Sequence, residues 1–191
     1  SRGGLKLEGA LRQSGLSVAG KRCLDVGQST GGFTDCLLQH GAASVVGVDV
    51  GHGQLHPAMR SDARVTCIEG INARALDATD LIAISEDATG SAASFGENFE
   101  VIVGDLSFIS LTLVLPALVP LLQPQGALLM LVKPQFELQP GQVGKGGIVK
   151  DATLYTLVER RIRDCLASLE MQVLGWYDSA ITGGDGNREF F

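Results

Sequence analysis

The stretch Leu24-Asp-Val-Gly-Gln-Ser-Thr-Gly-Gly-Phe33 decides the fold class of this 191-residue chain. The apolar run Arg22–Val26 that leads into it is typical of a buried strand, and Gly32–His40 after it is typical of a helix. Glycines in the connecting loop allow the backbone to turn tightly and to approach a ligand closely. The stretch therefore predicts a strand, a ligand-binding loop and a helix in succession.

Three classes of ligand use such a loop, and its residues discriminate among them. A phosphate loop requires a lysine where Phe33 stands, and a dinucleotide loop requires the pattern G-x-G-x-x-G, which Gln28 and Ser29 do not supply. The remaining pattern D-x-G-x-x-x-G-G suits S-adenosylmethionine, which has no pyrophosphate. The contacts expected from this loop are Asp25, Gly27, Gln28, Ser29, Gly31, Gly32 and Phe33.

The next two strands predict contacts to the nucleoside part of such a cofactor. Asp49, near the end of a Val-rich strand at Ser44–Val50, can accept hydrogen bonds from both ribose hydroxyl groups. The alternative is that Asp49 is only a turn residue. Asn72 follows a third strand at Arg64–Ile68 and is expected to meet the adenine. Val50 is included in the same set of cofactor contacts.

Strand and helix signals alternate along the rest of the chain. Repeated βα units predict a Rossmann-like α/β fold, in which a mostly parallel sheet carries helices on both faces. The remaining expected elements are a short helix near Gln54–Arg60, a strand at Glu100–Asp105, a helix at Ile109–Leu122, a strand at Ala127–Lys133, a helix at Asp151–Leu169 with Asp151 as N-cap, and a closing strand pair at Met171–Asp178 and Asn187–Phe191.

Two segments fall outside this alternation. Ser85–Asn98 is small, polar and contains glycine, so we expect an exposed loop insertion there. Pro134–Lys150 directly follows a central strand and contains four glycines and two prolines. Because open α/β sheets bind ligands beyond the carboxyl ends of their strands, this long loop is a functional candidate. A disordered connector is the alternative.

The composition limits which partners the chain can have: a membrane, a nucleic acid or a metal. An apolar content of 45% predicts a packed core, and no apolar stretch is long enough to span a bilayer. The net charge of −6 argues at first sight against nucleic acid, but the charge is uneven: residues 62–105 hold nine acidic and two basic side chains, whereas the first 22 residues hold five basic and one acidic. The spacing of the cysteines and histidines predicts no metal site.

Seven blocks of sequence, in order, resemble the TlyA or haemolysin-A-like branch of the FtsJ-type ribosomal RNA methyltransferases. The matches run from the first residue to the last few, which makes them far more specific than any one motif. The blocks are Ser1–Leu7, Asp25–Leu38, Val48–Leu55, Asp105–Ser110, Leu131–Glu137, Val143–Gly147 and Gly186–Phe190. Gln28 and Gly104 depart from the family pattern.

The resemblance implies a seven-stranded class I methyltransferase domain over residues 1–191 that uses S-adenosylmethionine. It implies 2′-O-methylation of a cytidine ribose in ribosomal RNA, by a catalytic tetrad of Lys6, Asp105, Lys133 and Glu189, with Asp105 also touching the cofactor. Family members usually carry an N-terminal S4-type RNA-binding domain, which we expect to be absent from this chain. We expect a cytoplasmic enzyme that acts on ribosomal RNA or a ribosomal subunit, without a metal and without a membrane.

The chemistry explains the need for these residue types. A ribose 2′-hydroxyl has a pKa well above neutral, so a lysine beside it can stabilise the developing alkoxide or accept its proton. We expect Lys133 to lie closest to the reaction. Two other classes stay open: a membrane-active cytolysin, which no amphipathic or spanning segment supports, and a cofactor-binding fold without catalysis, against which the intact tetrad argues.

A substitution in the glycine loop tests the cofactor assignment. Gly31→Val is expected to abolish binding of S-adenosylmethionine, because an added Cβ would occupy the approach path of the cofactor. Isothermal titration calorimetry measures the affinity directly. An unchanged dissociation constant in a folded Gly31→Val variant would refute the assignment of this loop.

Overall fold

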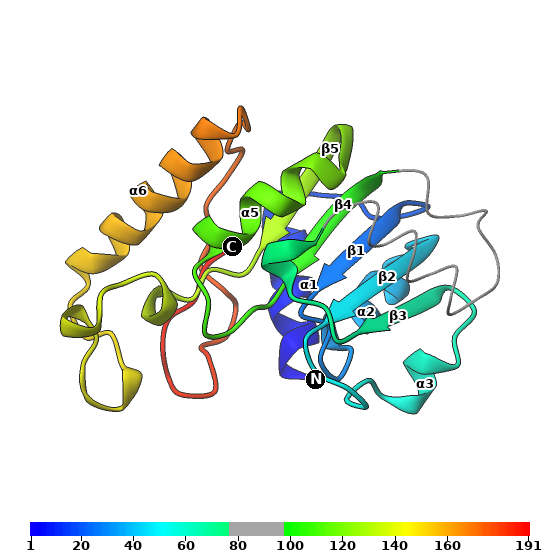
Figure 1. The fold of residues 1–191 in the computed structure, drawn as a ribbon, viewed down its shortest axis with the longest axis horizontal. Coiled ribbons are helices and arrows are strands. Elements are labelled where there is room, and N and C mark those ends of the chain that lie inside the picture. The colour runs from blue at the N-terminus through cyan, green and yellow to red at the C-terminus, as the bar shows by residue number, and fades with distance from the viewer. Residues whose placement is uncertain (77–97) are drawn as a thin grey trace.

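One parallel sheet of five strands forms the centre of the computed structural model, which describes residues 1–76 and 98–191 (Figure 1). The order β3-β2-β1-β4-β5 puts the strand before the glycine loop in the middle, and all pairings between these strands are parallel. The α/β class expected from the βα alternation is therefore confirmed. The strands are β1 (Arg22–Val26), β2 (Ser44–Asp49), β3 (Val65–Glu69), β4 (Phe99–Gly104) and β5 (Leu122–Met130).

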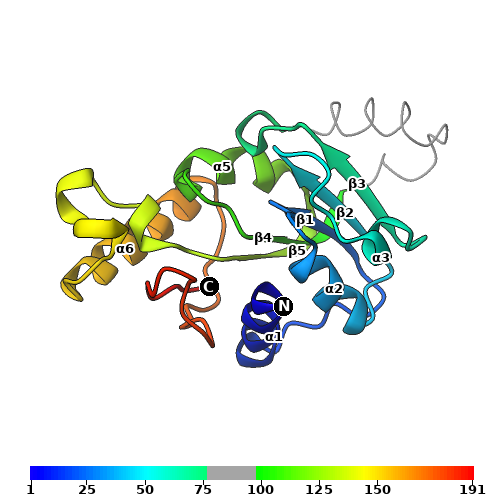
Figure 2. The same ribbon diagram turned by 90° about the horizontal axis from the view of Figure 1, so that it is seen from below.

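Helices cover both faces of the sheet, as expected (Figure 2). Successive strand residues point to opposite faces, so Leu24 and Val26 join the core under α5 and α6, whereas Cys23 joins the core under α1 and α2. Each face thus buries its own apolar cluster. The helices are α1 (Arg2–Ser14), α2 (Gly32–Gln39), α3 (Pro57–Arg60), α5 (Leu111–Leu118) and α6 (Thr153–Ser168).

The helix α1 is absent from the predictions above. Ser1 is its N-cap, because the Ser1 Oγ accepts a hydrogen bond of 3.0 Å from the Gly4 amide. Gly15 ends the helix in the left-handed conformation, with φ of 70°. Leu7 and Leu11 are buried on the face that packs against α2. A serine before and a glycine after an amphipathic run were the available signals.

Most other elements lie within a few residues of their expected positions. The observed β1 has the predicted bounds, while β5 ends at Met130 rather than at Lys133. The N-cap of α6 is Ala152, not Asp151, although the Asp151 carboxylate still accepts a 2.9 Å hydrogen bond from the Thr153 amide. The Pro134–Lys150 loop is folded into three short 3₁₀ turns. Residues 85–97 of the expected insertion lie outside the described residues.

The expectation of seven strands is wrong for the described part of the chain. The predicted closing strand pair, Met171–Asp178 and Asn187–Phe191, appears only as isolated antiparallel bridges of Phe190 to Val132 and Asp178. A hollow of about 420 Å³ is lined both by β5 and by residues 171–177. The two predicted strands pair only near their ends, where the Tyr177 amide donates a 2.9 Å hydrogen bond to the Phe191 carbonyl oxygen and the Ser179 amide a 2.8 Å hydrogen bond to that of Glu189. No helix within residues 1–76 and 98–191 is long and apolar enough to cross a bilayer.

A series of buried hydrogen bonds between side chains supports the glycine loop on the side of the sheet. Asp25 on β1 is wholly buried, and its Oδ2 accepts a 2.7 Å hydrogen bond from the Thr34 hydroxyl. Thr34 in turn accepts a 2.9 Å hydrogen bond from the Gln28 carboxamide. Burial raises the pKa of Asp25 to about 7, the hydrogen bond from Thr34 opposes this rise, and the negative charge of Asp105 adds to it.

This buried carboxyl group predicts a pH dependence of stability. Because the folded-state pKa lies above the usual value of 3.8, the contribution of Asp25 to stability is complete below about pH 4 and is lost as the pH rises to about 7. The three-unit shift corresponds to at most about 4 kcal/mol. Asp25→Asn should remove this dependence, so that the variant gains free energy of unfolding relative to the wild type between pH 4 and pH 7.

Urea unfolding at several pH values measures this difference. Asp164→Asn on α6 is the matched control, because Asp164 is exposed to solvent. The prediction would be contradicted if the free energy of unfolding changed with pH equally in the wild type and in Asp25→Asn.

Candidate active site

The glycine loop and the end of β4 meet at the carboxyl edge of the sheet. Gly27 follows β1 with φ of 79°, and a Cβ there would lie only 2.3 Å from the carbonyl oxygen of Asp105. No side chain fits in this position, so glycine is what allows the two strand ends to approach. The amide of Gly27 also donates a 2.9 Å hydrogen bond to the carbonyl oxygen of Val48 at the end of β2.

Asp49 joins the end of β2 to the same loop. Its Oδ2 accepts a 2.6 Å hydrogen bond from the Ser29 amide, and its Oδ1 accepts a 2.8 Å hydrogen bond from the Gly51 amide. Each carboxylate oxygen has a further lone pair, so the group can still accept hydrogen bonds from ribose hydroxyls. Asp49 is thus more than a turn residue, because it also connects two strand ends.

Two hollows open at this edge and share Gly27, Ser29 and Asp105. The first, the loop hollow, has a volume of about 230 Å³ and lies between the glycine loop and the start of α1, with Ser1 and Arg2 in its wall. The second, the strand-end hollow, has a volume of about 390 Å³. It is lined by Asp49, Val50 and Asn72 together with the segment 105–109. Together they form an elongated site around one glycine turn.

Most of the predicted cofactor contacts line one of these hollows, but Asp25 and Gly31 line neither. Gln28 borders the loop hollow, yet its carboxamide is buried and bonded to Thr34. Gly31 caps α2 with φ of 100°, and a Cβ there would lie 2.8 Å from the side chain of Leu55. The physical reason to expect damage from Gly31→Val is therefore backbone strain and this clash, not an obstructed approach path.

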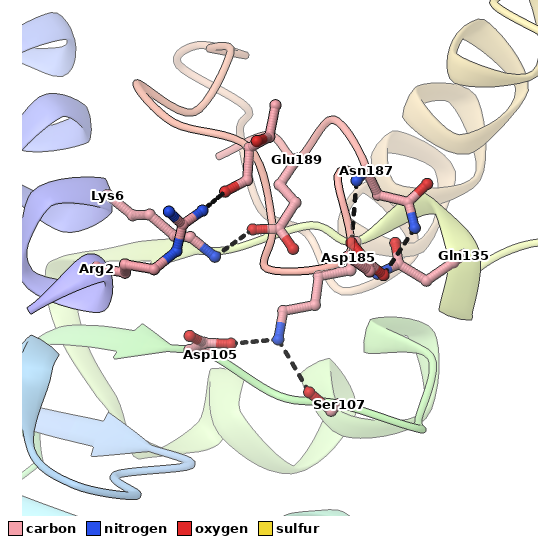
Figure 3. A network of polar contacts seen from close by, with 10 residues as sticks. Arg2, Lys6, Asp105, Ser107, Gln135, Asp185, Asn187 and Glu189 are labelled. Carbon is pink, nitrogen blue, oxygen red and sulfur yellow. Dashed lines mark hydrogen bonds and ion pairs between the residues drawn. The ribbon is translucent and has the colours of Figure 1, made fainter. Parts of the chain in front are cut away.

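The first lysine–carboxylate pair joins opposite ends of the chain. The Nζ of Lys6 on α1 lies 2.5 Å from the Oε1 of Glu189, and both side chains are buried, with exposed fractions of 8% and 3% (Figure 3). Arg2 donates a 2.5 Å hydrogen bond from the same helix to the carbonyl oxygen of Thr182. Removing one partner would leave the other as an unpaired buried charge, which is costly.

The second pair lies at the ends of β4 and β5. The Nζ of Lys133 is 2.5 Å from the Oδ1 of Asp105 and donates a 3.0 Å hydrogen bond to the hydroxyl of Ser107 (Figure 3). This pair is more open than the first, with exposed fractions of 11% and 28%. Asp105 lines both hollows, and Lys133 lines neither, so Lys133 is next to them through its contact with Asp105.

One backbone bridge brings the two pairs together. Val132 and Phe190 exchange antiparallel hydrogen bonds of 2.6 and 2.9 Å. In an antiparallel bridge the residue after one partner faces the residue before the other, so Lys133 lies opposite Glu189. The structure thus places all four residues of the predicted tetrad in one cluster of two cations and two carboxylates.

Several side chains at this edge are missing from the sequence predictions. Phe108 is 90% exposed and has a left-handed φ of 64°. The centroid of its ring lies 5.1 Å from the centroid of the Phe136 ring. Glu137 accepts hydrogen bonds of 2.5 and 2.8 Å from the Ser110 hydroxyl and the Leu111 amide at the start of α5. Burial raises the pKa of Glu137, and these hydrogen bonds oppose the rise.

Glu137 therefore ties the turn after Lys133 to the loop after Asp105 and keeps the two aromatic rings together. The signal in the sequence was the pair of blocks D-L-S-F-I-S and K-P-Q-F-E, each with one phenylalanine three residues after a tetrad member. Their contact is set by folding alone.

Comparisons with known proteins identify the family of the chain. The FtsJ-like methyltransferase family matches residues 1–191. The chain is 45% identical over 197 residues to the 16S/23S rRNA (cytidine-2′-O)-methyltransferase TlyA of Mycobacterium tuberculosis, covering all of this chain and 66% of that protein. It is 40% identical over 190 residues to Hemolysin A of Brachyspira hyodysenteriae, covering 74% of it. The chain thus spans about two thirds of the length of the relatives it matches.

Solved structures give the same result at the level of the fold. A hemolysin-type protein from Streptococcus thermophilus superposes with a TM-score of 0.89 at 40% identity, over all of this chain and 64% of that one. Fibrillarin from Aeropyrum pernix, solved with bound S-adenosylmethionine, superposes with a TM-score of 0.60 at 15% identity, over 99% of this chain and 74% of that one, and so shows the fold alone. The chain belongs to the FtsJ-like methyltransferase family.

Proposed function

We propose that this chain transfers a methyl group from S-adenosylmethionine to the ribose 2′-hydroxyl of a cytidine in ribosomal RNA. The observation that carries the proposal is the cluster of Lys6, Glu189, Lys133 and Asp105 beside two hollows that share a glycine turn. The rRNA (cytidine-2′-O)-methyltransferase name of a relative with 45% identity supports this choice of substrate.

The two hollows suit the two halves of S-adenosylmethionine. Asp49 and Asn72 would face the adenosine in the strand-end hollow, where the Asp49 carboxylate can accept both ribose hydroxyls. Gly27, Gly32 and Phe33 would border the amino-acid end in the loop hollow, with Ser29 between the halves. A Cβ at Gly27 would fill the passage, as its 2.3 Å approach to Asp105 shows. When bound, the cofactor supplies a methyl group activated by a positively charged sulfur.

Lys133 is the group best placed to act on the hydroxyl. Its ammonium lies between the Asp105 carboxylate and the Ser107 hydroxyl, so its position is fixed before a substrate arrives. A positive charge held there lowers the energy of the alkoxide that develops as the 2′-hydroxyl gives its proton to solvent water. Asp105 orients the lysine and lies at the border of both hollows.

Lys6 and Glu189 act beside this pair. Their salt bridge is almost wholly buried, so it keeps a fixed geometry and holds α1 against the C-terminal segment. Glu189 lies opposite Lys133 across the backbone bridge, so the buried salt bridge fixes the segment that faces the reacting lysine. The Lys6–Glu189 pair therefore helps to fix the position of the Lys133–Asp105 pair.

The exposed ring of Phe108 supports an RNA substrate. Single-stranded RNA bases stack on aromatic side chains, and such rings stand free of the protein surface until the RNA binds. Phe108 lies three residues after Asp105, in the wall of the strand-end hollow, and is backed by Phe136. A cytidine turned out of its helix could rest its base there while its ribose reaches Lys133.

Mass-spectrometric mapping of 2′-O-methyl groups on ribosomal RNA, with and without the protein, tests the proposed function. Lys133→Ala should retain the affinity for S-adenosylmethionine but lower single-turnover methyl transfer by about two to four orders of magnitude, the range for loss of a positioned acid–base group. Lys133→Arg should not rescue transfer, because the planar guanidinium differs in shape from an ammonium and would not occupy the same place between Asp105 and Ser107.

Lys145→Ala is a matched control, because Lys145 is an exposed lysine in the 3₁₀ turn Lys145–Gly147 and forms no part of the tetrad. Near-normal transfer by Lys133→Ala with saturating cofactor would remove the lysine from the mechanism. Absence of any new 2′-O-methyl group with the wild-type protein would refute the function itself.

A further inference from the structure

Asn187 is a buried carboxamide in the C-terminal segment, two residues before Glu189. Its exposed fraction is 2%. The Oδ1 accepts a 2.9 Å hydrogen bond from the Val149 amide, and the Nδ2 donates 2.8 Å hydrogen bonds to the Gly147 carbonyl oxygen and to the Oδ2 of Asp185. Both of its donors and its acceptor are therefore used, which is typical of a polar group that specifies a structure.

The backbone groups that Asn187 holds belong to the loop that follows Lys133. This loop closes on itself through a 2.8 Å hydrogen bond from the Gly144 amide to the Ile148 carbonyl oxygen. Gly146 and Gly147 both lie in the left-handed region, with φ of 74° and 79°. Glycine reaches this conformation without strain. The hydrogen bonds within the loop close the turn, and the bonds to Asn187 attach the closed turn to the C-terminal segment.

Asp185 extends the contact to the beginning of the same loop. It accepts a 3.3 Å hydrogen bond from the Gln135 carboxamide and a 3.0 Å hydrogen bond from the backbone amide of Asn187 (Figure 3). Desolvation acts to raise the pKa of Asp185, but the bonds from Asn187 and the charge of Lys133 outweigh it and hold the pKa below its usual value. One Asn–Asp pair thus binds the loop near both of its ends.

We propose that Asn187 is a positioning residue for methyl transfer: it clamps the loop after Lys133 to the segment that carries Glu189. This inference rests on the proposed function and deepens it. The bridge between Val132 and Phe190 aligns Lys133 with Glu189 at one point only. The Asn187 clamp adds a second attachment beyond the lysine, and two attachments fix an orientation that one leaves free to turn.

Asn187→Ala tests the clamp in single-turnover methylation of ribosomal RNA, at saturating cofactor and well below the unfolding temperature. We expect the rate to fall by about 10²-fold, the effect of an ångström-scale misplacement of a catalytic group. The dissociation constant of S-adenosylmethionine should stay within about twofold, because Asn187 lines neither cofactor hollow. If Asn187 had a purely structural role, its loss would instead lower the rate of transfer and the affinity for S-adenosylmethionine in parallel.

Asn98→Ala is the matched control. The Asn98 carboxamide also donates to two backbone carbonyl groups, those of Pro120 and Leu122, but it lies just before the amino end of β4. The carboxyl end of that strand leads to Asp105 and the site. The control should keep the wild-type rate of transfer, and a loss equal to that of Asn187→Ala would overturn the proposal.

A charge exchange keeps the test decisive if Asn187→Ala fails to fold. Asn187→Asp places two carboxylates against each other and should be at least as slow as the alanine variant. Adding Asp185→Asn restores one amide–carboxylate hydrogen bond and should recover about tenfold of the lost rate. No recovery in the double variant, or a wild-type rate in Asn187→Asp, would exclude the clamp.

Hydrogen exchange separates this inference from the proposed function. In Asn187→Ala the amide of Val149 loses its acceptor, so its exchange should accelerate by at least about tenfold, whether or not the protein methylates RNA. Unchanged protection of Val149 would refute the clamp even where methyl transfer is seen. The wild type could fail to transfer methyl groups while Val149 is protected only when Asn187 is present. This result would refute the proposed function but support the clamp.

Discussion

The site depends on the backbone bridge between Val132 and Phe190. Two hydrogen bonds, of 2.6 and 2.9 Å, attach the end of the chain to the residues just beyond β5. Both side chains are buried in the same apolar cluster, so packing supports the bridge. The arrangement of the four charged residues follows from its register: a shift by one residue would turn Lys133 and Glu189 to opposite faces. Lys6 would then be left as a buried charge without its partner, which is strongly destabilising.

The carboxyl edge of the sheet shows a second constraint, the close approach of backbone to backbone. At Gly27 the distance to Asp105 excludes any side chain, and at Gly47 a Cβ would overlap the buried carboxamide of Gln28. The space saved at Gly47 admits the chain of hydrogen bonds that ends at Asp25. The loop is thus held from below by buried polar groups, which leaves its upper surface open for a ligand.

The site combines rigid parts with an exposed part. The buried pair of Lys6 and Glu189 and the cap that Glu137 provides for α5 need no rearrangement when a substrate arrives. Phe108, in contrast, has an exposed ring and a backbone in the strained left-handed conformation. Strain of this kind persists only where the surrounding structure enforces it, and it commonly occurs at functional sites.

The sequence by itself determined the glycine loop and the central strand. These features depend on local patterns: turn glycines and apolar runs. The four residues of the predicted tetrad came from the resemblance to a family, and their catalytic roles stay a prediction. The helix α1 could have been found in the same way, from Ser1 and Gly15. What only the tertiary structure decided is which residues meet. Asp25 lies under the loop rather than in a hollow, the closing strands shrink to bridges, and Asn187 joins two segments far apart in sequence. These outcomes depend on burial and on hydrogen bonds between distant segments, which no local pattern encodes.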